Sequence, residues 1–122
     1  MKVLFAVGLG SCIGGILRYV ISIYISSKSS TEFPYGTLTV NIIGCLVIGI
    51  VYGFATKGII STEWRIFLAT GILGGFTTFS AFSYETFVML KQNDFINAAV
   101  YVFTSFIAGI IATFFGFWIS KL

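Results

Sequence analysis

Histidine is absent from this chain of 122 residues, and acidic residues are scarce. The only carboxylate side chains belong to Glu32, Glu63, Glu85 and Asp94. A metal-hydrolase centre or a general acid–base pair therefore has few residues from which to be built. Charged residues make up 9% of the chain, against roughly a quarter in soluble domains. These shortages exclude a soluble enzyme, and we expect no catalytic residues.

Basic residues are also few, and they are scattered. The formal net charge is +3, but no segment gathers lysines and arginines into a patch, which argues against a nucleic-acid partner. The two cysteines, Cys12 and Cys45, both lie in apolar stretches. We expect them to be small buried hydrophobic residues rather than a disulfide.

Apolar residues dominate the chain instead. They make up 57% of it, and the mean hydropathy is +1.03. Because a membrane-spanning helix needs about 20 residues, the length allows four helices and no soluble domain. We predict an all-helical integral membrane protein in the lipid bilayer, a single transmembrane domain over residues 1–122. Its spans are expected at about residues 3–26, 36–56, 63–90 and 95–119.

The start of the first apolar stretch resembles a signal peptide. The stretch continues past Arg18, however, and is longer than the apolar region of about 7–15 residues in such a peptide. We expect it to be the first span. An even number of spans places both termini on the same side of the membrane.

The third predicted span has an unusual composition. Between Gly71 and Glu85 it contains the adjacent glycines Gly74 and Gly75, four hydroxyl side chains and three phenylalanines. Helix-breaking residues are tolerated at membrane depth where the freed backbone is buried in protein or lines a polar cavity. We therefore predict a helix interrupted over Gly74–Thr78, in a segment that forms part of an ion or solute pathway.

Other polar side chains occur at helical spacing in neighbouring spans. Thr37 and Asn41 share one face of the second span. Asn41 could make an interhelical hydrogen bond or donate to an anion, and the nearby threonine favours the second interpretation. Tyr101 and Ser105 share a face of the fourth span and indicate a polar track. A serine alone more often bonds to a carbonyl of the preceding turn.

Three further residues have two possible interpretations. Phe79 and Phe82 follow the glycines on one helix face. They could pack, or they could present the positive edges of their rings to an anion. Arg18 could extend to the interface or have a structural or functional role, and a cation near a pore mouth would favour anions. The carbonyls freed by a helix break commonly coordinate a small monovalent cation.

The basic residues are nearly balanced between the two sides of the membrane. Four lie on the side of the termini: Lys2, Lys57, Arg65 and Lys121. Three lie towards the other side: Arg18, Lys28 and Lys91. The positive-inside rule needs a clear excess. This balance favours insertion in both orientations and an antiparallel dimer of identical chains. The alternative is a weak bias that gives one orientation.

Three segments resemble the signatures of the Fluc (CrcB) fluoride channels. They are Gly10–Tyr19, Gly36–Gly44 and Gly74–Glu85, and the resemblance extends over the whole chain. It implies a multi-pass protein of the bacterial plasma (inner) membrane. It further implies a dual-topology antiparallel homodimer with two fluoride pores. The implied function is passive, electrogenic export of fluoride, which lowers cytoplasmic fluoride and confers resistance.

The resemblance also implies roles for individual residues. Asn41 would donate to fluoride, and Phe79 and Phe82 would present their ring edges. The backbone carbonyls of Gly74 and Thr77 would hold a structural sodium ion at the dimer centre. The remaining implied residues form the polar track or lie near the pathway without a stated role: Tyr101, Ser105, Thr37 and Ser80 in the track, and Arg18 and Glu85 nearby.

Two other classes of protein compete with this interpretation. A small multidrug-type cation exporter has similar length, four spans and dual topology, but it needs a membrane-embedded carboxylate in its first helix. The first span here contains Arg18 and no acid, and the only embedded acid is Glu85. A scaffold subunit without transport would explain the small residues at helical spacing. It would leave Asn41 and the polar track without a purpose.

Overall fold

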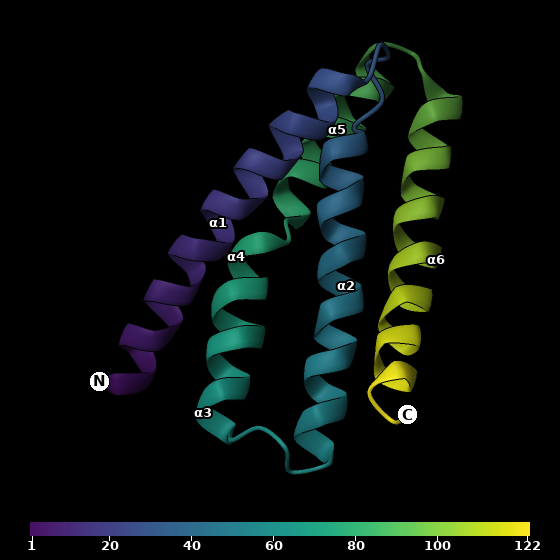
Figure 1. The fold of residues 1–122 in the computed structure, drawn as a ribbon. Coiled ribbons are helices and arrows are strands. Elements are labelled where there is room, and N and C mark those ends of the chain that lie inside the picture. Colours follow the sequence, from purple (N-terminus) through teal and green to yellow (C-terminus); the bar gives the residue numbers. More distant parts are fainter.

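The computed structural model describes residues 1–122, and every regular element in it is a helix (Figure 1). Four helical stretches are long and apolar enough to cross a membrane: Lys2–Lys28, Tyr35–Thr56, Thr62–Lys91 and Phe95–Ile119. The prediction of an all-helical chain with four spans is therefore confirmed. Both termini lie at the same end of the bundle, next to the α2–α3 connection (Figure 1).

The bundle consists of two helix pairs. Helix α1 (Lys2–Lys28) packs along the first half of the third span, and α2 (Tyr35–Thr56) packs along α6 (Phe95–Ile119). Helix α1 also contacts α2, which joins the pairs. Asp94 caps α6, because its carboxylate accepts from the backbone N–H of Asn97 at 3.3 Å.

The third span is divided into four segments: α3 (Thr62–Arg65), η1 (Ile66–Leu73), α4 (Gly74–Phe76) and α5 (Phe79–Lys91). Ser61 caps the start of α3. Segment η1 is a π-helix of eight residues, an uncommon form that is frequent at functional sites. The sequence did not indicate this wider helix.

The predicted interruption over Gly74–Thr78 is confirmed, and within that segment the helix breaks after the glycines. Gly74 and Gly75 are helical, within α4, while Thr77 and Thr78 have extended backbone with ψ of 156° and 120°. Gly75 is needed instead for close packing. A Cβ atom on Gly75 would collide with the backbone oxygen of Ser11 in α1.

Small residues form the contacts between helices, as their spacing predicts. A Cβ on Gly10 would lie 2.9 Å from the Cα of Gly71. In the other pair, a Cβ on Gly49 would collide with the backbone of Thr113. Close helix approach of this kind is typical of membrane bundles. These glycines therefore pack the helices of one chain together.

Much of the apolar surface is exposed. Only 21 of the 122 residues are buried, as expected for a chain surrounded by lipid or by a second copy. The two cysteines are unpaired, in agreement with the prediction. Cys12 is exposed on α1 rather than buried, because its helix face has no partner within the chain.

Candidate functional site: a polar cleft at the helix break

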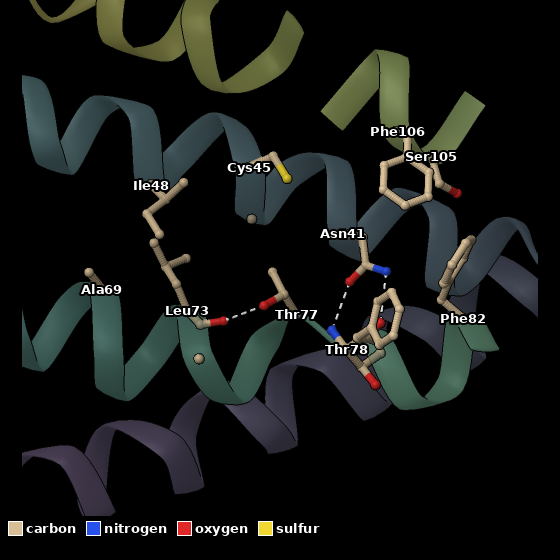
Figure 2. Close-up of a pocket in the computed structure, with 13 residues that line it drawn as sticks. Asn41, Cys45, Ile48, Ala69, Leu73, Thr77, Thr78, Phe82, Ser105 and Phe106 are labelled. Carbon is tan, nitrogen blue, oxygen red and sulfur yellow. Dashed lines mark hydrogen bonds between the residues drawn. The ribbon is translucent and has the colours of Figure 1, made fainter. Parts of the chain in front are cut away.

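A cleft of about 340 Å³ opens beside the helix break, between α2, the third span and α6 (Figure 2). No charged side chain lines it. Its walls combine amide, hydroxyl and phenyl groups with aliphatic side chains. The lining residues are Asn41, Gly44, Cys45, Ile48, Ala69, Leu73, Gly74, Thr77, Thr78, Phe79, Phe82, Ser105 and Phe106.

Asn41 holds the broken backbone in place. Its side chain extends from α2 to Thr78 and makes two hydrogen bonds with that residue (Figure 2). The Nδ2 group donates to the Thr78 carbonyl at 3.0 Å, and the Thr78 N–H donates to Oδ1 at 2.8 Å. An amide group has two N–H donors, so the second remains for another acceptor. The interhelical interpretation of Asn41 is thus correct, and donation to an anion stays a prediction.

The break deprives two carbonyls of their helical donors. In a continuous helix, the N–H of Thr78 would donate to the Gly74 oxygen, and the N–H of Ala81 to the Thr77 oxygen. Here the Thr78 N–H donates to Asn41, and the Ala81 N–H donates to Oγ1 of Thr78 at 3.2 Å. The carbonyls of Gly74 and Thr77 have therefore lost their helical donors, which makes them candidates to bind another group.

The two predicted phenylalanines lie in different environments. Phe82 is 8% exposed and lies at the inner wall of the cleft, whereas Phe79 is 73% exposed at its outer edge. Their ring centroids are 5.6 Å apart. Phe106 of α6 meets Phe82 edge to face at 6.1 Å. The sequence analysis did not identify Phe106, which follows Ser105 in an otherwise ordinary apolar stretch.

Glu85 connects three helices through two short hydrogen bonds. Thr37 of α2 donates to Oε1 at 2.6 Å, and Tyr101 of α6 donates to Oε2 at 2.6 Å. Tyr101 is fully buried. The structure thus brings together two residues of the predicted polar track and the embedded acid. Their hydroxyl hydrogens are directed at the carboxylate.

Ser105 lies one turn further along α6 and lines the cleft itself (Figure 2). Its Oγ atom is buried and has no hydrogen-bond partner. A buried unpaired hydroxyl is costly, which makes this atom a candidate to bind a ligand.

Two further predicted residues belong neither to the cleft lining nor to the hydrogen-bonded group around Glu85. Ser80 is exposed, and its hydroxyl is 3.2 Å from Oγ1 of Thr78. Arg18 lies on α1, where its Nε atom is buried without a hydrogen-bond partner. The structure does not place Arg18 with the other candidate residues.

A second cavity, of about 460 Å³, lies at the end of the bundle away from the termini. It contains Glu32, Glu85 and Asp94 among its lining residues. Glu85 therefore stands between the uncharged cleft and an acidic outer cavity. The sequence did not indicate this cavity, because its residues come from two loops and three helices.

These features define a multi-pass helical membrane protein in which a broken span borders an uncharged polar cleft, the architecture of an ion or solute pathway. The family described as "CrcB-like protein, Camphor Resistance (CrcB)" matches residues 5–117, and the chain belongs to that family.

Full-length relatives support the same assignment. A protein of Flavobacterium psychrophilum is 41% identical over 122 residues, covering 99% of this chain and 98% of the relative. One of Phocaeicola vulgatus is 39% identical, covering 99% and 100%. One of Methylobacillus flagellatus is 44% identical over 118 residues, covering 95% and 92%. Each is named "Fluoride-specific ion channel FluC". The chain is thus a multi-pass bacterial membrane protein.

Proposed function

We propose that this chain is a fluoride channel of the bacterial plasma membrane that exports fluoride passively. The observation that carries the proposal is the uncharged cleft beside the helix break, lined by amide, hydroxyl and phenyl groups. Family membership and the names of the relatives support fluoride as the ion. Such a channel lowers cytoplasmic fluoride because the negative membrane potential drives the anion outwards.

Partial positive charges in the cleft suit a small anion. The second Nδ2 hydrogen of Asn41 and the unpaired hydroxyl of Ser105 are available donors. The ring of Phe82 offers a positive edge. None of these groups carries a full charge, and a permeant ion must bind strongly enough to enter and weakly enough to leave.

Thr37 and Tyr101 enter this pathway differently. Their hydroxyls hold Glu85 in the present arrangement. They can donate to fluoride only after the carboxylate moves away. We therefore assign both residues, together with Glu85, to the passage between the cleft and the acidic outer cavity.

The working unit in this proposal is an antiparallel homodimer. Phe79 and Gly74 are exposed at the open side of the cleft, where a second chain could cover them. The near balance of basic residues between the two sides favours insertion in both orientations. A second copy would then close the cleft and add its own Phe79 to the pathway.

We assign a structural sodium ion to the free carbonyls of Gly74 and Thr77. The donor chemistry fits, because carbonyl oxygens at the end of an unwound helix coordinate small monovalent cations. Both carbonyls lie beside the exposed edge of the cleft, so an ion there could be shared by two chains. Bound sodium would hold the helix ends in the broken arrangement.

Ion efflux from liposomes tests the function. Purified protein is reconstituted in vesicles loaded with fluoride or chloride, and release is followed with ion-selective electrodes. We expect fluoride to leave only when an ionophore such as valinomycin balances the charge, and chloride to remain inside. Fluoride retention by correctly assembled protein would contradict the proposal.

The alternative, a small multidrug-type cation exporter, is not favoured. That class needs an accessible carboxylate in the first span, and α1 has none. The only acid away from the ends of a span, Glu85, accepts hydrogen bonds from Thr37 and Tyr101.

A further inference from the structure

The net charge of this protein is concentrated at one end of the bundle. The end that carries the termini has four basic side chains and one acid, Glu63, a balance that equals the net charge of +3 for the whole chain. At the opposite end, Lys28 and Lys91 are matched by Glu32 and Asp94. Within the spans, Arg18 is matched by Glu85. The two ends therefore differ in net charge, although the basic residues number four and three when Arg18 is counted towards the opposite end.

The four cations belong to four different elements, all at the terminal end of the bundle (Figure 1). We call them the terminal basic surface. It consists of Lys2 at the start of α1, Lys57 after α2, Arg65 at the end of α3 and Lys121 after α6. Residues from opposite ends of the sequence are thus collected around one rim.

Two of these cations are held against the apolar part of the bundle. The Nζ atom of Lys121 donates to Oγ1 of Thr56 at 2.6 Å and lies 4.7 Å from the centre of the Phe117 ring. The guanidinium of Arg65 lies 5.9 Å from the centre of the Tyr52 ring. These contacts keep the charges at the boundary between the apolar helix faces and the polar end.

Both tryptophans of the chain lie at the same end. Trp64 in α3 is 59% exposed, and Trp118 in the last turn of α6 is 56% exposed. Tryptophan is enriched where a membrane protein crosses the lipid headgroups. The terminal basic surface is therefore at headgroup depth.

We infer that the terminal basic surface binds the headgroups of anionic phospholipids. Lysine and arginine near a membrane surface attract anionic lipid, and the attraction adds up over several residues. A single acid at this end leaves most of that attraction uncompensated. The opposite end, with balanced charge, has no such preference. This property belongs to the end of the chain and holds in whichever leaflet that end lies.

The two tryptophans allow a direct test with the whole protein. The protein is reconstituted in vesicles of phosphatidylglycerol and phosphatidylcholine in equal amounts, with bromine atoms on the acyl chains of either lipid. Bromine quenches tryptophan fluorescence on contact, so quenching reports which lipid surrounds the terminal end. We expect quenching by the brominated anionic lipid to be about threefold stronger.

Substitutions then test whether the lipid preference comes from the terminal basic surface. Combined replacement Lys57→Gln, Arg65→Gln and Lys121→Gln should make the two brominated lipids quench equally. The matched control, Lys28→Gln with Lys91→Gln, should leave the preference unchanged. A further control moves the probe to the neutral end, with Trp64→Phe, Trp118→Phe and Phe95→Trp. It should show a weaker preference, because in the antiparallel dimer only the partner's terminal end attracts anionic lipid to that leaflet.

Salt provides a measurement that needs no variant. In the unaltered protein, the preference should decrease in molar salt, where charges are screened within about 3 Å. Equal quenching by both lipids in the unaltered protein at low salt would overturn the inference. So would a preference that persists in the triple variant.

Discussion

At the residue scale, Asn41 combines a structural role at the helix break with a proposed role as a donor in the cleft. It pairs with the peptide group of Thr78, which keeps the third span broken. It also retains one N–H for the cleft. An amide can do both because it is donor and acceptor at once without a charge. A carboxylate or an aliphatic group of similar size can do only part of this.

Asn41→Asp tests this dual role. The aspartate can still accept from the Thr78 N–H, but it cannot donate to the carbonyl, and it adds a negative charge at membrane depth. We expect fluoride efflux from liposomes to decrease by about tenfold or more. Asn93→Asp, at an exposed position in the α5–α6 loop that lines neither cavity, is the control and should leave efflux unchanged. Unimpaired efflux in the Asn41 variant would remove this side chain from the pathway.

The Glu85 cluster has a consequence for stability. Tyr101→Phe keeps the buried ring but removes the hydroxyl that donates to the carboxylate. Hydrogen bonds to charged groups contribute about 1.5–3 kcal/mol. We therefore expect thermal unfolding in detergent at a lower temperature than for the unaltered protein. Tyr84→Phe, at an exposed position next to Glu85 in the chain, is the matched control. Equal unfolding temperatures for both variants would contradict the assigned bond.

At the scale of elements, the third span differs from the other three in having no continuous helix. Its first half is a π-helix and a short helix packed on α1, and its second half begins again at Phe79. The packing on α1 depends on glycines that allow the backbones to touch. The break therefore depends on a tight contact with α1 as well as on Asn41.

Gly75→Ala tests this contact. Its Cβ would meet the backbone of Ser11, which cannot move without displacing α1. We expect lower thermal stability and less assembled protein in gel filtration. Gly15→Ala is the matched control, because a Cβ there meets no atom within 4 Å. Since alanine favours helix by about 1 kcal/mol, the control should be as stable as the unaltered protein or more so. If Gly75→Ala is as stable as the unaltered protein, the backbones of α1 and α4 do not need to be this close.

At the scale of the whole molecule, the groups that have no partner within one chain lie on one side of the bundle. The cleft is open, Phe79 is exposed at its edge, and the Gly74 and Thr77 carbonyls have lost their helical donors. The proposed antiparallel dimer with sodium at its centre would cover all three. Formation of the dimer would then depend on which cation the buffer contains.

Sodium removal tests that link. In gel filtration, we expect a dimer in sodium buffer and a shift towards monomer, with loss of fluoride efflux, when N-methylglucamine replaces sodium. The bulky organic cation cannot fit between backbone carbonyls. Returning sodium should restore both properties, which serves as the control. If assembly and efflux are the same in both buffers, the two carbonyls hold no structural cation.

Sequence reasoning predicted the environment of some residues and missed that of others. The break was expected between Gly74 and Thr78, since glycine lowers helix stability. It occurs at Thr77 and Thr78, because Asn41 and the Thr78 side chain capture the two backbone N–H groups there. Local composition indicated an interruption but could not position it, since one of these partners lies on another helix.

By itself, the sequence determined that this protein has four membrane-spanning helices, because apolar segments in a bilayer must satisfy their backbone groups internally. It also indicated which of the four spans is broken. Only the tertiary structure decided what the polar residues of the spans bind. Asn41 and Thr78 are 37 positions apart, and Thr37 and Glu85 are 48 apart. No helical period connects such positions, so their contacts follow from how the four helices pack.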